Sequence, residues 1–146
     1  MTETSTTNRP AGLEAYAARG KVTAVKDGVL TFAPSGTNYE MHLASPNDAG
    51  QVGALAEGLI HVVARKLWTV PSGGNFVSPI FGSPRTIQGR VRMVSNGTIV
   101  VHAGAPFVVD LPTDDAGIGL PNGLITVGAM VNIMAMPGAR FVPLAK

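Results

Sequence analysis

The residues with the clearest potential for chemistry are cations, and they gather in an acid-free interval of the chain. No Asp or Glu occurs between Glu57 and Asp110, whereas Lys and Arg recur there and are interleaved with Trp68, Phe76 and Phe81. Cations neutralise phosphate groups and aromatic rings stack on bases, so this composition predicts a surface for single-stranded nucleic acid. The candidate residues for this anion or nucleic-acid surface are Arg65, Lys66, Trp68, Arg85, Arg90 and Arg92.

The overall charge is small. A formal net charge of +2 at pH 7 argues against strong non-specific binding to polyanions. Charged residues make up 14% of the chain and hydrophobic residues 45%, so few charges remain to coat an isolated monomer, and a homo-oligomer is expected. The leading interpretation is a non-catalytic, self-associating β-barrel module for assembly or for binding a partner macromolecule, such as another protein. A single-stranded nucleic-acid-binding protein is the alternative.

The histidines give little indication of catalysis or metal binding. His42, His61 and His102 belong to separate expected strands and lack the spacing of a metal-binding motif. His42 and Asp110 are expected at equivalent positions of two repeats, where they could form an acid–base pair, but no nucleophile accompanies them. The absence of cysteine removes thiolate chemistry and thiolate metal sites. We therefore expect no enzyme activity, no cofactor and no metal.

The elements that must position these residues indicate an internal duplication. Residues 20–32 and 89–101 both read as β-hairpins, because β-branched runs flank an Asp-Gly or Asn-Gly dipeptide that tolerates the positive φ angles of a type I′ turn. Alternation predicts that Val22 and Ala24 point inward, as do their counterparts Val91 and Met93 in the second copy, and that the basic residues face solvent. The identical positions are Gly20/Gly89, Val22/Val91, Val25/Val94 and Gly28/Gly97.

Later segments extend this correspondence. Residues 39–43 and 107–111 each predict a third strand, residues 60–70 predict a long fourth strand, and residues 76–79 and 141–143 predict fifth strands.

Two further expectations concern the first repeat. Residues 52–56 are expected to form a short helix between the third and fourth strands. Trp68 is expected in the core, because it alternates in register with Ile60, Val62 and Ala64.

Three strands, a loop or short helix, and two further strands is the element order of the five-stranded OB-type barrel, which residues 20–144 resemble twice over. The expected fold is therefore all-β, with two tandem OB-like small barrels. A β-sandwich of two meanders is the structural alternative. The tandem pair also looks similar in size to the paired oxyanion-binding barrels of molybdate-handling proteins, but we do not find their ligand residues. An oxyanion-binding protein or an enzyme is therefore a distant third interpretation.

The expected domain organisation has three parts. Residues 1–19 are expected to be a disordered tail ending in a short helical turn, which the spacing of Leu13 and Tyr16 indicates. The first β repeat is expected over residues 20–82 and the second over residues 83–146.

No targeting or membrane segment is expected. Residues 1–8 lack the basic and apolar regions of a secretory signal. The most apolar stretch, residues 124–136, is too short to span a bilayer and is interrupted by Asn132. These features predict a cytoplasmic protein without membrane contact.

Overall fold

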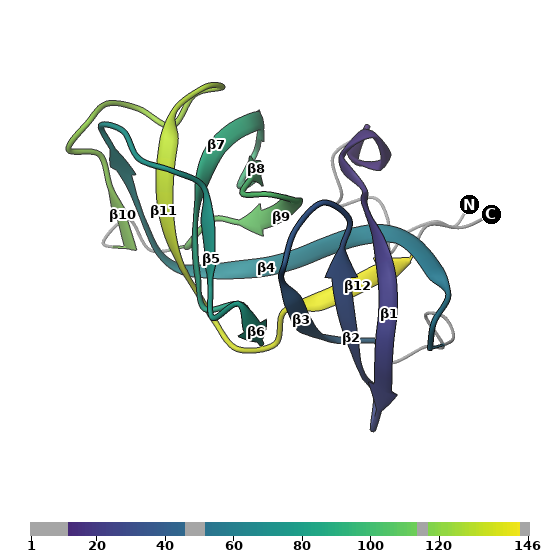
Figure 1. Ribbon diagram of the computed structural model, residues 1–146. Helices are drawn as coiled ribbons and strands as arrows, with labels where there is room; N and C mark the ends of the chain where they lie inside the picture. Colours follow the sequence, from purple (N-terminus) through teal and green to yellow (C-terminus); the bar gives the residue numbers. More distant parts are fainter. Residues whose placement is uncertain (1–11, 46–51, 114–116, 144–146) are drawn as a thin grey trace, which may run out of the picture.

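The computed structural model describes residues 12–45, 52–113 and 117–143 of the 146-residue chain. It confirms the expectation of an all-β protein, with 60% strand and 3% helix. The described residues form one 3-10 helix, η2 (Leu13–Tyr16), and a mixed 12-stranded sheet (Figure 1). No helix among them is long and apolar enough to cross a lipid bilayer.

The helix η2 confirms the helical turn expected before the first hairpin. Leu13 is only 1% exposed. It is buried in a small cluster on the outer side of the sheet, separate from the main core. The first strand begins at Ala18, within the segment assigned from the sequence to the tail. Residues 1–10, expected to be disordered, lie outside the described residues. The buried cluster around η2 contains Leu13, Leu59, Val100 and Val108.

A first ring of strands can be traced through consecutive pairings. Its members are β1 (Ala18–Lys26), β2 (Val29–Pro34), β3 (Glu40–Ala44), β12 (Arg140–Pro143) and the beginning of β4 (Leu55–Val70). β1 pairs with β2 and β4, β2 pairs with β3, and β12 pairs with both β3 and β4. The contact between β12 and β3 is parallel and consists of one residue pair, Arg140 with Ala44.

A second ring is built in the same order. Its members are β7 (Thr86–Ser95), β8 (Thr98–His102), β9 (Pro106–Asp110), β11 (Met130–Ala135) and the later part of β4. β7 pairs with β8 and β11, β8 pairs with β9, and β4 pairs with both β9 and β11. As in the first ring, the closing strand runs parallel to the third strand, here β4 beside β9.

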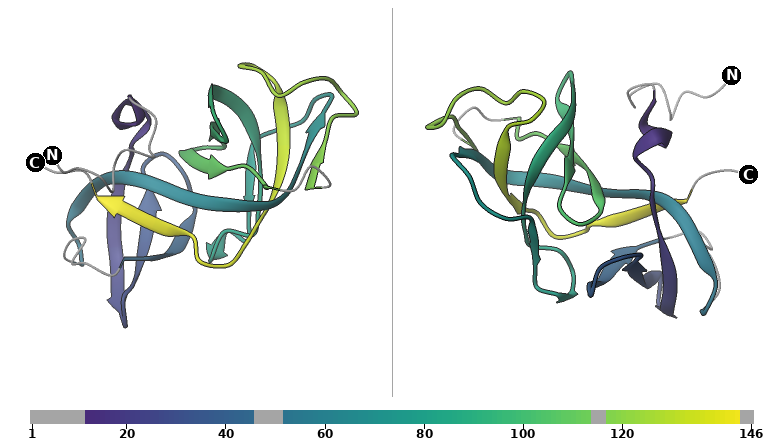
Figure 2. Two further views of the ribbon diagram at one scale, coloured as in Figure 1. Left: turned by 180° about the vertical axis from the view of Figure 1, so that it is seen from behind. Right: turned by 45° about the horizontal axis from the view of Figure 1, so that its top comes forward.

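Each ring is closed by a strand from the other half of the sequence. β4 begins in the first ring and continues into the second, with β12 beside its N-terminal part (Figure 2). The expectation that residues 76–79 form the fifth strand of the first repeat is wrong. β5 (Phe76–Ser78) pairs with β7 of the second ring, because the 16-residue β4 has already carried the chain there.

The segment before β4 is not the expected helix. Residues 52–53 form a turn and Leu55 begins the strand. The backbone of Val22 explains this conformation: its N–H donates to the Ala54 carbonyl at 3.0 Å, and its carbonyl accepts from the Gly53 N–H at 2.7 Å. These bonds hold the segment against β1 in an extended path. The short strands β6 (Phe81–Gly82) and β10 (Ile118–Gly119) pair with β3 and β4.

The two hairpins have the same register. In each hairpin, the ladder shifts by one residue directly after the first valine that the two hairpins share, Val22 or Val91. Such a bulge adds a residue to one strand and interrupts its alternation. Consequently Ala24 is exposed, and Met93 packs on the outer cluster around η2, although both were expected to point inward.

The hairpin turns differ from one another in one respect. Gly28 and Gly97 have φ angles of 77° and 76°, as expected for turn glycines. Asp27 also has a positive φ, 53°, so the first turn has the predicted type I′ pattern. Asn96 is not in the positive region, and the second turn therefore departs from that prediction.

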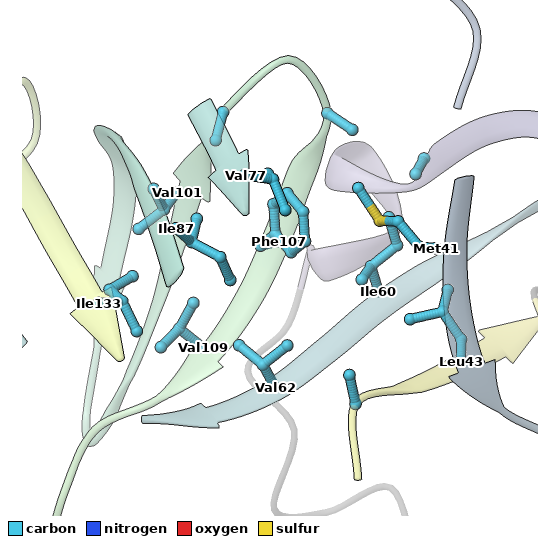
Figure 3. Packing of buried hydrophobic residues seen from close by; sticks show 14 of the residues in the cluster. Met41, Leu43, Ile60, Val62, Val77, Ile87, Val101, Phe107, Val109 and Ile133 are labelled. Atoms are coloured by element: carbon cyan, nitrogen blue, oxygen red, sulfur yellow. The ribbon is translucent and has the colours of Figure 1, made fainter. Parts of the chain in front are cut away.

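One hydrophobic core runs through both rings. Figure 3 shows Met41 and Leu43 of the first ring at one end and Ile133 of the second ring at the other, with Ile60 and Val62 of β4 between them. Because β4 contributes to this core on its way from ring to ring, the rings share one packed interior.

Candidate functional site

The cations identified in the sequence all lie on or beside the second ring. Arg65 and Lys66 belong to β4, Arg90 and Arg92 belong to β7, and Arg85 directly precedes β7. All five side chains are exposed. Since β11 pairs with β4 on one side and with β7 on the other, these cations lie on or beside three adjacent strands of the sheet.

A row of four residues crosses this sheet and its edge strand β5. Trp68 pairs with Asn132, Asn132 with Gln88, and Gln88 with Phe76. Paired residues in adjacent strands point to the same side of a sheet. The preceding residue on β4, Leu67, is buried in the core, so these four residues face outward. We call Trp68, Asn132, Gln88 and Phe76 the outer row.

Hydrogen bonds connect the two amides of the outer row. Asn132 Nδ2 donates to Gln88 Oε1 at 2.9 Å, and Gln88 Nε2 donates to the carbonyl oxygen of Gly74 at 2.9 Å. Gly74 belongs to the loop that joins β4 to β5, so this loop lies against the outer row. Because a carbonyl can only accept, the direction of the whole chain of bonds is determined.

Two of the cations share the face of the outer row. Lys66 is two residues from Trp68 on β4 and pairs with Met134, and Arg90 is two residues from Gln88 on β7 and pairs with Met130. Arg90 Nη1 also donates to the Gly128 carbonyl at 2.9 Å.

The other three cations are placed differently. Arg65 and Arg92 are the residues that the ladder skips at the bulges of β4 and β7. Arg85 lies directly before the first residue of β7, where its N–H donates to the Ser78 carbonyl and its carbonyl accepts from the Ala135 N–H. The structure therefore brings Lys66, Trp68 and Arg90 onto one face, whereas Arg65, Arg85 and Arg92 stand outside the paired positions of these strands.

Trp68 is half-buried. The expectation that it lies in the core is therefore wrong. The bulge at Arg65 reverses the alternation of β4, so that Ala64 and Leu67 both point into the core and Trp68 points outward. Sequence reasoning also missed Asn132 and Gln88. The available signal at Asn132 was a polar amide within the otherwise apolar strand β11.

The sheet around the outer row is free of negative charge. β5, β7, β11 and residues 58–70 of β4 contain no Asp or Glu. Among the described acids, Glu57 lies in the first ring, where its Oε2 is 3.1 Å from Arg19 Nε. Asp110 of β9 accepts a hydrogen bond from Thr98 Oγ1 at 3.2 Å and lies 3.3 Å from His61 Nε2.

The histidines lie at separate places in the fold. His42 meets Phe81 edge-on at 5.2 Å, His61 faces Asp110, and His102 ends β8. The expectation that His42 and Asp110 are equivalent is wrong, because His42 pairs with Thr31 whereas Asp110 pairs with Thr98, a different level of the matching hairpin. In the described part of the chain, no group of three or more His, Asp or Glu residues could hold a metal ion.

Comparison with protein-family models, with curated proteins and with solved structures finds no match for this chain.

Proposed function

We propose that the protein is a non-catalytic binding module that holds single-stranded nucleic acid on the outer face of its second ring. The observation that favours this function is the shared face of Lys66, Arg90 and the half-buried Trp68 in a part of the sheet without acidic residues. Cations there neutralise phosphates and release condensed counterions, and the indole offers a surface on which a base can stack.

Salt dependence tests this function. In a titration of a labelled 12-nucleotide single strand, the logarithm of the affinity should fall linearly with the logarithm of the salt concentration. Lys66→Ala should reduce the slope by about 1, because it removes one phosphate contact. Lys26→Ala, the same change at the tip of the first hairpin, is the matched control and should leave the slope unchanged. Absence of binding by the wild type at low salt would refute the proposal.

The architecture is proposed to be a duplicated OB-type unit with exchanged closing strands. Two rings built in one order, with equal bulges, fit the five-stranded barrel expected from the sequence. Backbone bonds also match between the rings. The Val91 N–H donates to the Ala129 carbonyl at 2.9 Å, and the Gly128 N–H donates to the Val91 carbonyl at 2.8 Å. In the first ring, Val22 makes the same two bonds, donating to the Ala54 carbonyl and accepting from the Gly53 N–H.

Self-association is a second candidate function, favoured by one difference between the segments that lead into the two rings. Before β1, η2 docks on the second ring and buries Leu13. Before β7, β6 docks on β3 of the first ring, but Ile80 and Phe81 remain 53% and 62% exposed. An exposed aromatic and aliphatic pair of this kind is suited to contact with another protein or a second copy.

Light scattering tests self-association, because it measures the mass of the protein in solution. We expect at least a dimer at micromolar concentration, and Phe81→Ser should shift the mass towards the monomer. The same change at Phe76, in the outer row, is the control and should not alter the mass. A monomeric wild type over a hundredfold range of concentration would rule out self-association.

A further inference from the structure

We propose that Trp68 and Asn132 form a nucleobase subsite, in which one unpaired base stacks on the indole and presents its edge to the Asn132 amide. This inference rests on the proposed function and specifies which part of the nucleic acid the face recognises. It concerns base contact, whereas Lys66 and Arg90 act on the phosphates.

The orientation of the Asn132 amide supports this subsite. Gly74 accepts from Gln88, and Gln88 in turn accepts from Asn132 Nδ2. Asn132 lies between Gln88 on β7 and Trp68 on β4. Its nitrogen is engaged by Gln88, so Oδ1 is the amide atom that does not take part in this bond.

Asn132 also retains capacity for a ligand. An amide side chain offers two N–H donors and an oxygen with two lone pairs. One N–H bonds to Gln88, and no described residue hydrogen-bonds Oδ1. A donor and an acceptor therefore remain side by side on an amide whose position is already fixed.

On the other side of Trp68 the paired residue is a glycine. This residue is Gly119 of β10, where an added Cβ would lie 3.3 Å from the Trp68 Cβ. Asn132 stands about 4.8 Å away on the opposite side, the usual strand spacing. A base stacked on the indole thus has a glycine as the paired neighbour of Trp68 on one flank and the Asn132 amide on the other.

The chemistry selects unpaired bases without selecting one base type. The Watson–Crick edge of every base carries a donor and an acceptor next to each other, which one amide can match. In a duplex this edge is occupied by the partner base, and the base faces are stacked. The subsite therefore predicts preference for a single strand over a duplex of equal charge.

Trp68 is the only tryptophan of the chain, so its fluorescence reports directly on the subsite. Binding of an eight-nucleotide single strand should quench this fluorescence and protect it from iodide. A fully abasic strand of equal length and charge should bind about tenfold more weakly and should not quench. These measurements use the wild type and do not depend on the folding of a variant.

A variant isolates the amide. Asn132→Leu should weaken single-strand binding about fivefold and leave the salt slope unchanged, because it removes a hydrogen bond but no phosphate contact. Asn38→Leu, the same change at an exposed position of the first ring, is the control. If the wild type binds the intact and abasic strands equally and its fluorescence does not change, the subsite is wrong while phosphate binding stands. If no strand binds at low salt, the proposed function itself is wrong.

Discussion

Gly20 and Gly89 occupy equivalent positions in β1 and β7, and neither leaves room for a side chain. A Cβ at Gly20 would collide with the carbonyl oxygen of Ala33, and a Cβ at Gly89 would collide with the carbonyl oxygen of His102. In each case the colliding backbone belongs to the other strand of the hairpin. These glycines therefore allow the close approach with which each strand curls into its ring.

Gly89→Ala is expected to lower the free energy of unfolding by about 1–3 kcal/mol, since the added methyl group must displace backbone. Gly97→Ala should cost about 1–2 kcal/mol for a different reason: the turn has free space, but φ is 76°. Urea denaturation measures both losses. Asn tolerates the left-handed region, so Gly97→Asn should restore most of the loss at the turn. Gly89→Asn should restore none of the loss at the strand, and recovery there would contradict the steric explanation.

At the scale of elements, β12 is the strand that completes the interior of the first ring. Phe141 is 2% exposed, and its ring lies 4.9 Å from that of Phe32. Phe141 also packs over Gly58 of β4, where a Cβ would meet the phenyl ring at 2.6 Å. A four-residue strand thus supplies a large aromatic contact across β2 and β4.

Phe141→Ala should lower the free energy of unfolding by about 3–5 kcal/mol, because it leaves a cavity in this interior. Phe76→Ala is the matched control. Phe76 is 39% exposed on the edge strand β5, and its loss should cost clearly less. Thermal and urea denaturation of the two variants compare the sites. Equal losses would show that β12 does not close the ring as its pairings indicate.

The sequence was sufficient to predict the hairpins but insufficient to predict which strands close the rings. Alternation and the Asp-Gly and Asn-Gly dipeptides act locally, so they are visible in the sequence. A bulge is one extra residue without a distinctive composition, and the one at Arg65 reversed the expected facing of Trp68. Periodicity also gives no information on partners, which explains why β5 was assigned to the wrong ring.

The candidate surface was predictable to a similar extent. The acid-free interval of the sequence contains most of β4 and all of β5 and β7, so the absence of acidic side chains on these strands could be read from the sequence alone. The amides of Gln88 and Asn132 come from strands far apart in the sequence, and only the register of β7 and β11 brings them together. No local pattern could have paired them.

At the scale of the whole molecule, the exchange of closing strands predicts that the halves depend on each other. Fragments 1–73 and 74–146, divided in the loop between β4 and β5, separate β12 from the first ring and β4 from the second. Neither fragment alone should show a cooperative unfolding transition. An equimolar mixture should recover the circular dichroism and thermal transition of the intact chain.

The fragment experiment has a clear opposite outcome. If either fragment unfolds cooperatively as a monomer at the temperature of the intact chain, its ring closes without the exchanged strand. Phe141→Ala in fragment 74–146 provides a control, because it should weaken recovery in the mixture by removing a contact that crosses between the fragments.

The placement of β12 also has a consequence for the order in which the protein can fold during synthesis. β1, β2, β3 and the start of β4 leave the ribosome first, yet the ring they form is completed by a strand translated after all the strands of the second ring. The second ring has β4 available before its own strands emerge. The earlier ring must therefore wait with an open edge while the strands of the second ring are translated, which makes the interval before β12 emerges the period of greatest exposure to misassembly.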